Sequence, residues 1–171
     1  MKKIIGLVVS LTVISGACAA VLAFVNTLTA EPIAQMLVVK TQAAAKAVMP
    51  TEVSTVEEAD GVFVGKNAAG EVVGYAAKGS DPGGYGGDVV LMVGFQADKR
   101  TVVAYKTLAA AETPGLGMKL NTPEFAGQFA GKDATALKVR KDGGDIDAIT
   151  SATITSRAVC AAIAAASKSL N

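Results

Sequence analysis

The stretch DVVLMVGFQADKRTVVAYKTL, Asp88 to Leu108, decides the fold of this chain. Its two apolar runs, Asp88 to Gln96 and Thr101 to Leu108, are rich in valine and other residues that favour strands. Between them, Ala97 to Arg100 is a short polar connection of the length that joins the two strands of a hairpin. The stretch therefore predicts a pair of antiparallel strands.

A second hairpin is expected just upstream. VFVGK, Val62 to Lys66, and EVVGYAAKG, Glu71 to Gly79, flank the turn-like run Asn67 to Gly70. The segment Thr51 to Asp60 before it is polar and is expected to be a break, whereas Thr135 to Arg140 can add one more short strand. Because no strand–helix–strand rhythm of about 30 residues follows, we expect an α+β fold with an antiparallel sheet of at least four strands.

Two helices are expected beyond the sheet. The first has Thr122 as its cap and Pro123 at its first position, and it should stop near Gly131. The second is alanine-rich from Arg157 to Ala166, which suits a closely packed helix face, and it should end near Ser169. We therefore expect helices to flank the antiparallel sheet.

The N-terminal part of the chain predicts a membrane anchor. Ile4 to Val25 carries no charge, and the next ionisable side chain is Glu31. Such a run spans about 33 Å as a helix, enough for the hydrocarbon layer of about 30 Å. Lys2 and Lys3 precede it, so the positive-inside rule predicts a cytoplasmic N-terminus and an extracytoplasmic domain.

Two alternatives to a retained anchor are a cleaved signal peptide and a lipoprotein. Ala17 to Ala19 resembles a small-residue cleavage site, but the apolar run is longer than the usual 7 to 15 residues of the apolar region of a signal peptide. A lipoprotein would have a large aliphatic residue three positions before Cys18, where this chain has Ser15. We therefore expect residues 1–26 to be a transmembrane anchor, 27–50 a helical stalk, and 51–171 one domain.

The composition narrows the possible functions. The 16 Lys and Arg against 15 Asp and Glu leave a net charge of +1, so no nucleic-acid partner is expected. The chain has no histidine, and its only cysteines are Cys18 and Cys160, so no metal site or iron–sulfur cluster is expected. If the protein carries out redox chemistry, an organic cofactor must supply it.

Two glycine-rich segments are candidates for ligand binding. SDPGGYGGD, Ser80 to Asp88, reads as a flexible connection, or as a loop that approaches a ligand closely with the Tyr85 ring available for stacking. In AAETPGLGMK, Ala110 to Lys119, Pro114 and Gly115 have the signature of a type II turn. A plain turn leaves three side chains unexplained, and these would suit a flat heteroaromatic group with polar edges: Glu112, Thr113 and Leu116.

A third segment, DAITSATITSRAV from Asp147 to Val159, contains five hydroxyl side chains. If Thr155 or Ser156 caps the last helix, Thr153 stands just ahead of the helix N-terminus, where backbone N–H groups favour a phosphate. Arg157 would add a positive charge in the first turn. The alternative is a plain capped helix with no ligand.

These residues resemble the flavinylation motif of the FMN-binding domain family, in which an aspartate precedes a Ser/Thr-Gly-Ala-Thr core. The resemblance implies that Asp147 is the upstream acid and that Thr153, the last residue of the core, carries FMN through a phosphoester bond. A separate flavin transferase would make this bond. Ser151 occupies the position of the core glycine, where a positive φ angle would disfavour serine.

GYGG at Gly84 to Gly87 and ETPGLG at Glu112 to Gly117, together with the anchor, resemble the G subunits of Rnf electron-transport complexes. The nearest relatives would be the C subunits of sodium-pumping NADH:quinone reductases. The resemblance implies an electron-transfer subunit in a bacterial or archaeal cell membrane, with other membrane subunits as partners. The implied cofactor-binding residues are Tyr85, Glu112, Thr113, Gly115, Leu116, Ser151, Ala152 and Thr153.

No side chain is expected to be catalytic, because Thr153 would act only as a tether and the flavin would carry the electrons. Two other functions remain possible from the sequence. One is a stand-alone anchored flavoprotein that donates electrons to an extracytoplasmic reductase. The other is an anchored binding or assembly module without a flavin.

Overall fold

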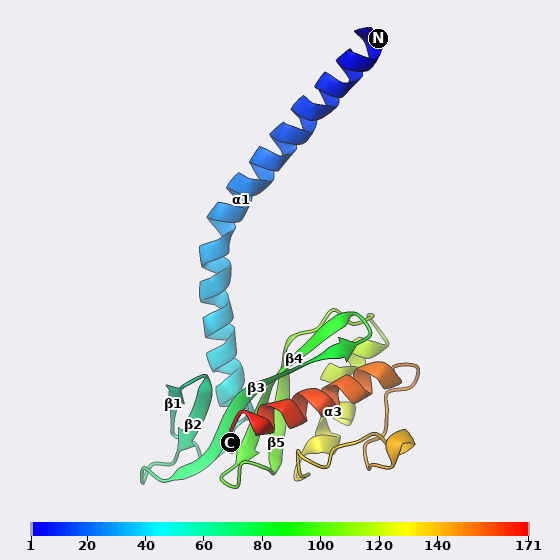
Figure 1. Ribbon diagram of the computed structural model, residues 1–171. Helices are drawn as coiled ribbons and strands as arrows, with labels where there is room; N and C mark the ends of the chain where they lie inside the picture. Colours follow the sequence, from blue (N-terminus) through cyan, green and yellow to red (C-terminus); the bar gives the residue numbers. More distant parts are fainter. Residues whose placement is uncertain (1, 171) are drawn as a thin grey trace. The chain divides into compact units, whose positions relative to one another are not determined.

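The computed structural model describes residues 2–170 of the chain (Figure 1). It divides into two compact units, one ending at Lys40 and the other beginning at Thr41. A long apolar helix, a five-stranded antiparallel sheet and further helices confirm the predicted α+β class. The boundaries expected for anchor, stalk and domain (1–26, 27–50 and 51–171) stay predictions.

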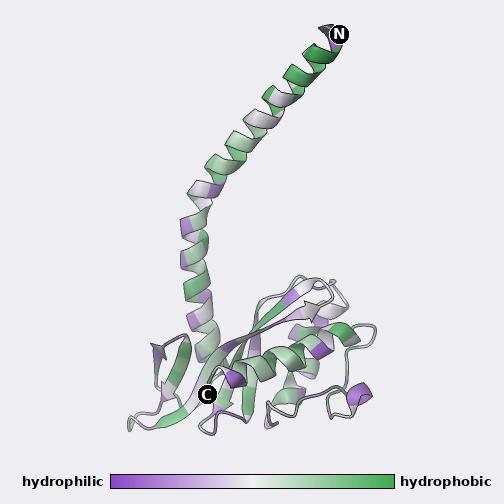
Figure 2. Ribbon diagram, in the orientation of Figure 1, coloured by the Kyte–Doolittle hydropathy of each residue, from purple (hydrophilic) through white to green (hydrophobic). Residues whose placement is uncertain are grey.

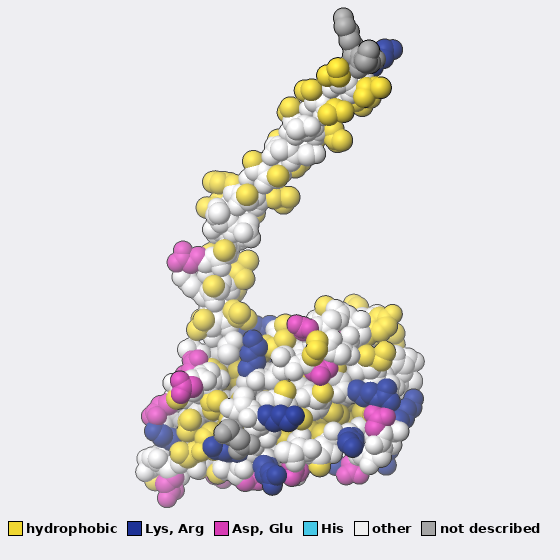
Figure 3. All heavy atoms as spheres, viewed as in Figure 1, with side chains coloured by type: hydrophobic (Ala, Val, Ile, Leu, Met, Phe, Trp, Pro, Cys, Tyr) yellow, Lys and Arg dark blue, Asp and Glu magenta, His cyan; other side chains and the backbone are white. Residues whose placement is uncertain are grey.

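The first element is α1 (Lys2–Val48), a helix of 47 residues. It runs through the expected anchor and most of the expected stalk as one continuous helix, and it ends at Val48, before Pro50. Its N-terminal half is mostly apolar (Figure 2), and apolar side chains project along the visible side of that half (Figure 3). The helix is long and apolar enough to cross a membrane, and its most apolar stretch is not buried by the rest of the structure. It is the one such helix among residues 2–170.

The sheet of the second unit is an antiparallel meander in which neighbours in the chain are also neighbours in space. Both predicted hairpins are present, and in the central pair Ala77 faces Val93. A meander suits this chain, because its short polar turns can join adjacent antiparallel strands without crossover helices. The strands are β1 (Thr55–Ala59), β2 (Val62–Lys66), β3 (Val72–Gly84), β4 (Gly87–Gln96) and β5 (Val102–Ala109).

Three expectations about strands were wrong. The polar segment 51–60, expected to be a break, contains the edge strand β1, which pairs with β2 and carries an ion pair between Glu57 and Lys66 at 2.6 Å. The segment 80–88, expected to be an irregular connection, is mostly strand, because β3 and β4 continue into it and leave only two residues between them. The segment 135–140 forms no strand, and only Val139 makes an isolated bridge.

The last helix, α3 (Thr153–Lys168), packs against β3 and β4. It approaches β3 so closely at Gly79 that a Cβ atom there would overlap the backbone carbonyl oxygen of Ala162, and only glycine permits this contact. The main core fills the space between this helix and the sheet, with Leu91, Phe95 and Phe129 fully buried. The alanine-rich face of α3 therefore has the packing role that the sequence predicted.

A second, smaller core is formed by residues of β2 to β5 together with the last turns of α1 and Met49. Ala44, Ala45, Val48 and Met49 are buried together with Met92 and other apolar side chains. Residues that the sequence assigned to a stalk thus contribute to the hydrophobic core of the second unit. Their burial explains why this unit begins at Thr41.

The remaining helices are short. Thr122 and Pro123 start a helix as predicted, but α2 (Pro123–Ala126) ends well before Gly131, and the Thr122 hydroxyl donates to the Lys119 carbonyl instead of capping the helix. The chain continues as a 3₁₀ helix, and Gly131 then takes a positive φ of 75°. The 3₁₀ helices are η1 (Gly117–Asn121), η2 (Gly127–Phe129) and η3 (Arg140–Asp142).

Candidate functional site

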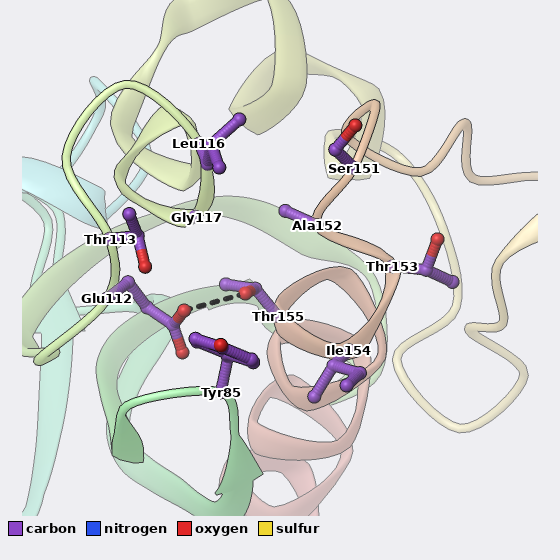
Figure 4. A pocket seen from close by; sticks show the side chains of 10 residues that line it. All are labelled: Tyr85, Glu112, Thr113, Leu116, Gly117, Ser151, Ala152, Thr153, Ile154 and Thr155. Carbon is purple, nitrogen blue, oxygen red and sulfur yellow. Dashed lines mark hydrogen bonds between the residues drawn. The ribbon is translucent and has the colours of Figure 1, made fainter.

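A cavity of about 510 Å³ lies where three segments that are distant in the chain come together (Figure 4). These segments are the tip of the β3–β4 hairpin, the loop after β5, and the start of α3 with the residues just before it. The volume is in the range of small-molecule pockets, which are mainly apolar with a few polar groups. The lining residues are Tyr85, Glu112, Thr113, Leu116, Gly117, Ser151, Ala152, Thr153, Ile154 and Thr155.

Seven of the eight residues expected to bind the cofactor line this cavity. The exception is Gly115, which has φ 75° in a turn where the Leu116 N–H donates to the Thr113 carbonyl oxygen at 3.2 Å. This geometry fits the predicted type II turn, which needs a positive φ at its third position. Gly115 therefore shapes the loop without lining the cavity.

Sequence reasoning missed three lining residues, Gly117, Ile154 and Thr155. All three belong to motifs that had been singled out, so the signal was present in the sequence. For Ile154 and Thr155, the side that faces the cavity depends on where α3 begins. The helix starts at Thr153 with Ala152 as its N-cap, so the prediction that Thr155 or Ser156 caps it was wrong.

A buried carboxylate stands at the centre of the site. Glu112 is only 5% exposed, and its Oε2 accepts a hydrogen bond of 2.7 Å from the hydroxyl of Thr155, which is buried as well. Its Oε1 accepts a longer bond of 3.4 Å from the backbone N–H of Gly86. One side chain thus connects the loop after β5 with both the hairpin tip and the first turn of α3.

The glycines of the two glycine-rich motifs make room for this carboxylate. A Cβ atom at Gly84 would lie 2.7 Å from Oε1 of Glu112, and one at Gly117 would overlap Oε2. A Cβ atom at Gly86 would overlap the carbonyl oxygen of Ala111. Close approach of backbone to backbone and to a buried side chain is the physical reason for glycine at these positions.

The hydroxyl groups of the segment 147–159 differ in what they bind. Ser156 is buried, and its Oγ accepts from the Ile149 N–H at 2.9 Å and donates to the Ala152 carbonyl at 3.0 Å. The Thr155 hydroxyl donates its hydrogen bond to the Glu112 carboxylate. These two hydroxyls are therefore internal to the fold and out of reach of a modifying enzyme.

Thr153 is different because its hydroxyl makes no hydrogen bond with any residue in the described range 2–170. The residue is half-buried at the first position of α3, and its side chain points away from Glu112 and Tyr85 in Figure 4. No side chain caps this helix end. Its backbone N–H groups are thus available to a negatively charged group near Thr153.

Ser151 takes the backbone conformation that its place in the motif suggested. Its φ is 63°, in the left-handed region, where residues other than glycine are strained by about 1 to 2 kcal/mol. The chain turns here, with the Ala152 N–H donating to the Ile149 carbonyl oxygen at 2.9 Å, and Ala152 then takes the N-cap position of α3. Serine is therefore compatible with the turn, at an energetic cost that glycine would avoid.

Two ion pairs hold the loops around the motif. Arg140 pairs with Asp147, and the backbone N–H of Asp147 donates to the Gln128 amide oxygen at 2.7 Å. Arg157 donates two hydrogen bonds of 2.7 Å to Asp142 and so holds the pKa of that carboxyl below its ordinary value. Asp147 does not line this cavity, and its part in the flavinylation motif stays a prediction.

The rim of the cavity exposes apolar side chains. Tyr85 is 72% exposed, Leu116 42% and Ile154 49%, although large apolar side chains of the second unit are mostly buried. Apolar groups gathered at a pocket mouth indicate a binding site. A flat aromatic group between these side chains, with the polar groups of Glu112 and Thr113 nearby, would fit the residues present.

The family comparison identifies the class of protein. The FMN-binding domain family matches residues 84–168, a range that includes every residue lining the cavity. NqrC of Shewanella oneidensis has a similar fold, with a TM-score of 0.53 at 21% identity over 71% of this chain and 66% of its own. The C subunit of the Na⁺-translocating NADH-quinone reductase of Parabacteroides distasonis has a TM-score of 0.51 at 28% identity, over 64% of this chain and 60% of its own.

Relatives of nearly full length then narrow the class. The G subunit of the ion-translocating oxidoreductase complex of Methanosarcina acetivorans is 33% identical over 95% of this chain and 92% of its own length. The G subunit of the Na⁺-translocating ferredoxin:NAD⁺ oxidoreductase complex of Acetobacterium woodii is 32% identical over 95% of this chain and 89% of its own. The chain belongs to this family of G subunits with an FMN-binding domain, as its motifs predicted.

Proposed function

We propose that this chain is an electron-transfer subunit of an Rnf-type ion-translocating oxidoreductase complex and that it carries one FMN on Thr153 through a phosphoester bond. The cavity at the start of α3 is the observation that supports this most. Its polar wall and apolar rim suit a flavin ring, and the Thr153 hydroxyl at its edge has no partner among residues 2–170. FMN would supply reversible uptake and release of electrons.

The residues of the chain would bind and orient this cofactor. Leu116, Ile154 and Tyr85 would contact the faces of the ring, because they are apolar and exposed at the rim. Thr113 would meet its polar edge. Thr153 would keep the flavin from diffusing away and would have no further role in turnover, so no side chain of this chain is assigned a catalytic role.

Complete turnover is not expected from this chain alone. The relatives of nearly full length are named as subunits of oxidoreductase complexes. We therefore propose that electrons reach and leave the flavin through other subunits of such a complex, close to the rim of the cavity. The ferredoxin:NAD⁺ activity in the name of the Acetobacterium relative is the activity that we propose for this complex.

Maturation would need a flavin transferase that reaches Thr153 from outside the domain. Thr155 and Ser156 are only 1% and 0% exposed, whereas Thr153 is half-buried and begins the helix. The free helix end beside it would stabilise the negative charge of the phosphodiester. Accessibility and charge thus favour Thr153 over its neighbours as the attachment site.

The test is the intact mass of the full-length protein produced together with a flavin transferase. We expect one FMN adduct in the wild type, no adduct in Thr153→Ala, and an unchanged adduct in Thr150→Ala, the matched loss of an exposed hydroxyl in the same motif. An adduct that survives Thr153→Ala would show that another hydroxyl is used. A bare chain in every sample would refute covalent flavin.

A further inference from the structure

The Glu112 carboxylate is an unusual group for the interior of a cavity wall. Burying a charged carboxylate is costly unless hydrogen bonds replace its water, and an apolar side chain of similar size would fill the same space without that cost. Here one oxygen accepts from the Thr155 hydroxyl at 2.7 Å and the other from the Gly86 N–H at 3.4 Å. We therefore look for the function of this carboxylate in the two segments that it connects, the first turn of α3 and the tip of the β3–β4 hairpin.

Each group in this network is next in the chain to a residue that faces the flavin cavity. Gly86 follows Tyr85, Thr155 follows Ile154, and Glu112 precedes Thr113. Tyr85 and Ile154 are the exposed apolar side chains of two different walls, one on the hairpin tip and one on α3. The hydrogen bonds of Glu112 therefore link the two walls between which a ring would bind.

The residues around Glu112 also restrict where its carboxylate can lie. Glycine at positions 84 and 117 admits the carboxylate, and a side chain at either position would collide with one of its oxygens. In the placement that these glycines allow, both oxygens of the carboxylate are bonded. A fixed placement is what distinguishes a positioning group from a side chain that only fills space.

We propose that Glu112 and Thr155 form a positioning pair whose buried hydrogen bond holds the hairpin tip and the first turn of α3 at the spacing that the flavin ring needs. This inference rests on the proposed function of the cavity. It assigns to Thr155 a role distinct from that of Thr153: the first residue tethers the cofactor, and the second shapes the site that receives its ring.

The experiment compares Thr155→Val, which keeps the shape of the side chain but removes the hydroxyl, with Thr155→Ser, which keeps the hydroxyl. Thr150→Val is the control for the same substitution at an exposed position of the motif. Hydrogen exchange of residues 84–87 and 112–117 is measured on full-length protein made without a transferase. The absorbance and fluorescence anisotropy of the flavin are measured on flavin-loaded protein whose adduct is verified by mass.

In Thr155→Val, we expect exchange in both segments to speed up about tenfold, the factor that corresponds to loss of about 1.4 kcal/mol. The flavin signals should shift toward those of free FMN although the adduct is retained, because the tether at Thr153 is intact. Thr155→Ser and Thr150→Val should match the wild type in both measurements.

Two outcomes would overturn the positioning pair. One is unchanged exchange in Thr155→Val. The other is an unchanged flavin signal in a variant whose melting temperature falls, which would make the bond merely structural. A wild type without an adduct would refute flavin attachment instead, and the exchange measurement would still decide whether the pair joins the two walls.

Discussion

Replacing Ser151 by glycine should stabilise the protein, because Ser151 has a φ of 63°. A residue with a side chain costs about 1 to 2 kcal/mol in the left-handed region. Glycine avoids this strain but loses more conformational entropy on folding, about 0.5 to 1 kcal/mol. At the middle of these two ranges the difference is a net gain of about 0.75 kcal/mol for Ser151→Gly.

Thermal unfolding of the full-length protein in detergent is the assay. For a domain of this size, the predicted gain corresponds to a rise in melting temperature of about 2 to 4 °C. Ser151→Ala is the matched control, since it removes the hydroxyl and keeps the strain, and it should not be stabilised. Gly143→Ser makes the reverse exchange at a φ of 81°, where an added Cβ meets no atom within 4 Å, and should lower the melting temperature.

The strain at Ser151 would be refuted as the cause if Ser151→Gly melted at or below the temperature of Ser151→Ala. In that case the serine hydroxyl, and not the backbone conformation, would be what the fold uses at this position. Flavin attachment adds a second check. Ser151→Gly should retain the FMN adduct, because glycine takes the same backbone conformation and leaves Thr153 unchanged.

Two further predictions concern sidedness and pH. We propose that the N-terminus is cytoplasmic and the flavin domain extracytoplasmic. Protease added to right-side-out vesicles should therefore digest the domain and spare roughly the first 25 residues, the length of a membrane-spanning helix. Protection of the domain would reverse this orientation, and a mature N-terminus near Ala19 would indicate a cleaved signal peptide. Burial raises the pKa of the Cys160 thiol to about 11, so the neutral thiol is favoured in the folded state and its stabilising contribution is present below about pH 9. The free energy of unfolding should therefore fall by about 2 kcal/mol between about pH 9 and 11, and Cys160→Ala should remove this part of the fall. An identical pH profile in that variant would contradict the assignment, whereas a fall that remains above about pH 10 would come from Tyr105, whose pKa burial also raises.

The features that the sequence by itself determined are local. The two hairpins could be predicted because apolar runs alternate with short polar turns, and these patterns act within about 20 residues of each other. The same holds for the uncharged run from Ile4 to Val25 and for the turn at Gly115, where few residue types are compatible with a positive φ. The residues that line the cavity were named from motifs, and most of them do line it.

Only the tertiary structure decided how these motifs meet. β1 carries mostly exposed residues and is a strand because β2 offers it a partner. The start of α3 at Thr153 depends on the reversal at Ser151, which leaves Thr155 free to bond Glu112 from 43 positions away in the chain. A contact between residues so distant in sequence leaves no periodic pattern, because its free energy arises only after the sheet and α3 have packed together. The role of Gly84 is also not visible in the sequence, where it reads as an ordinary loop glycine. Only the folded structure shows that a Cβ atom there would come too close to the buried Glu112 carboxylate.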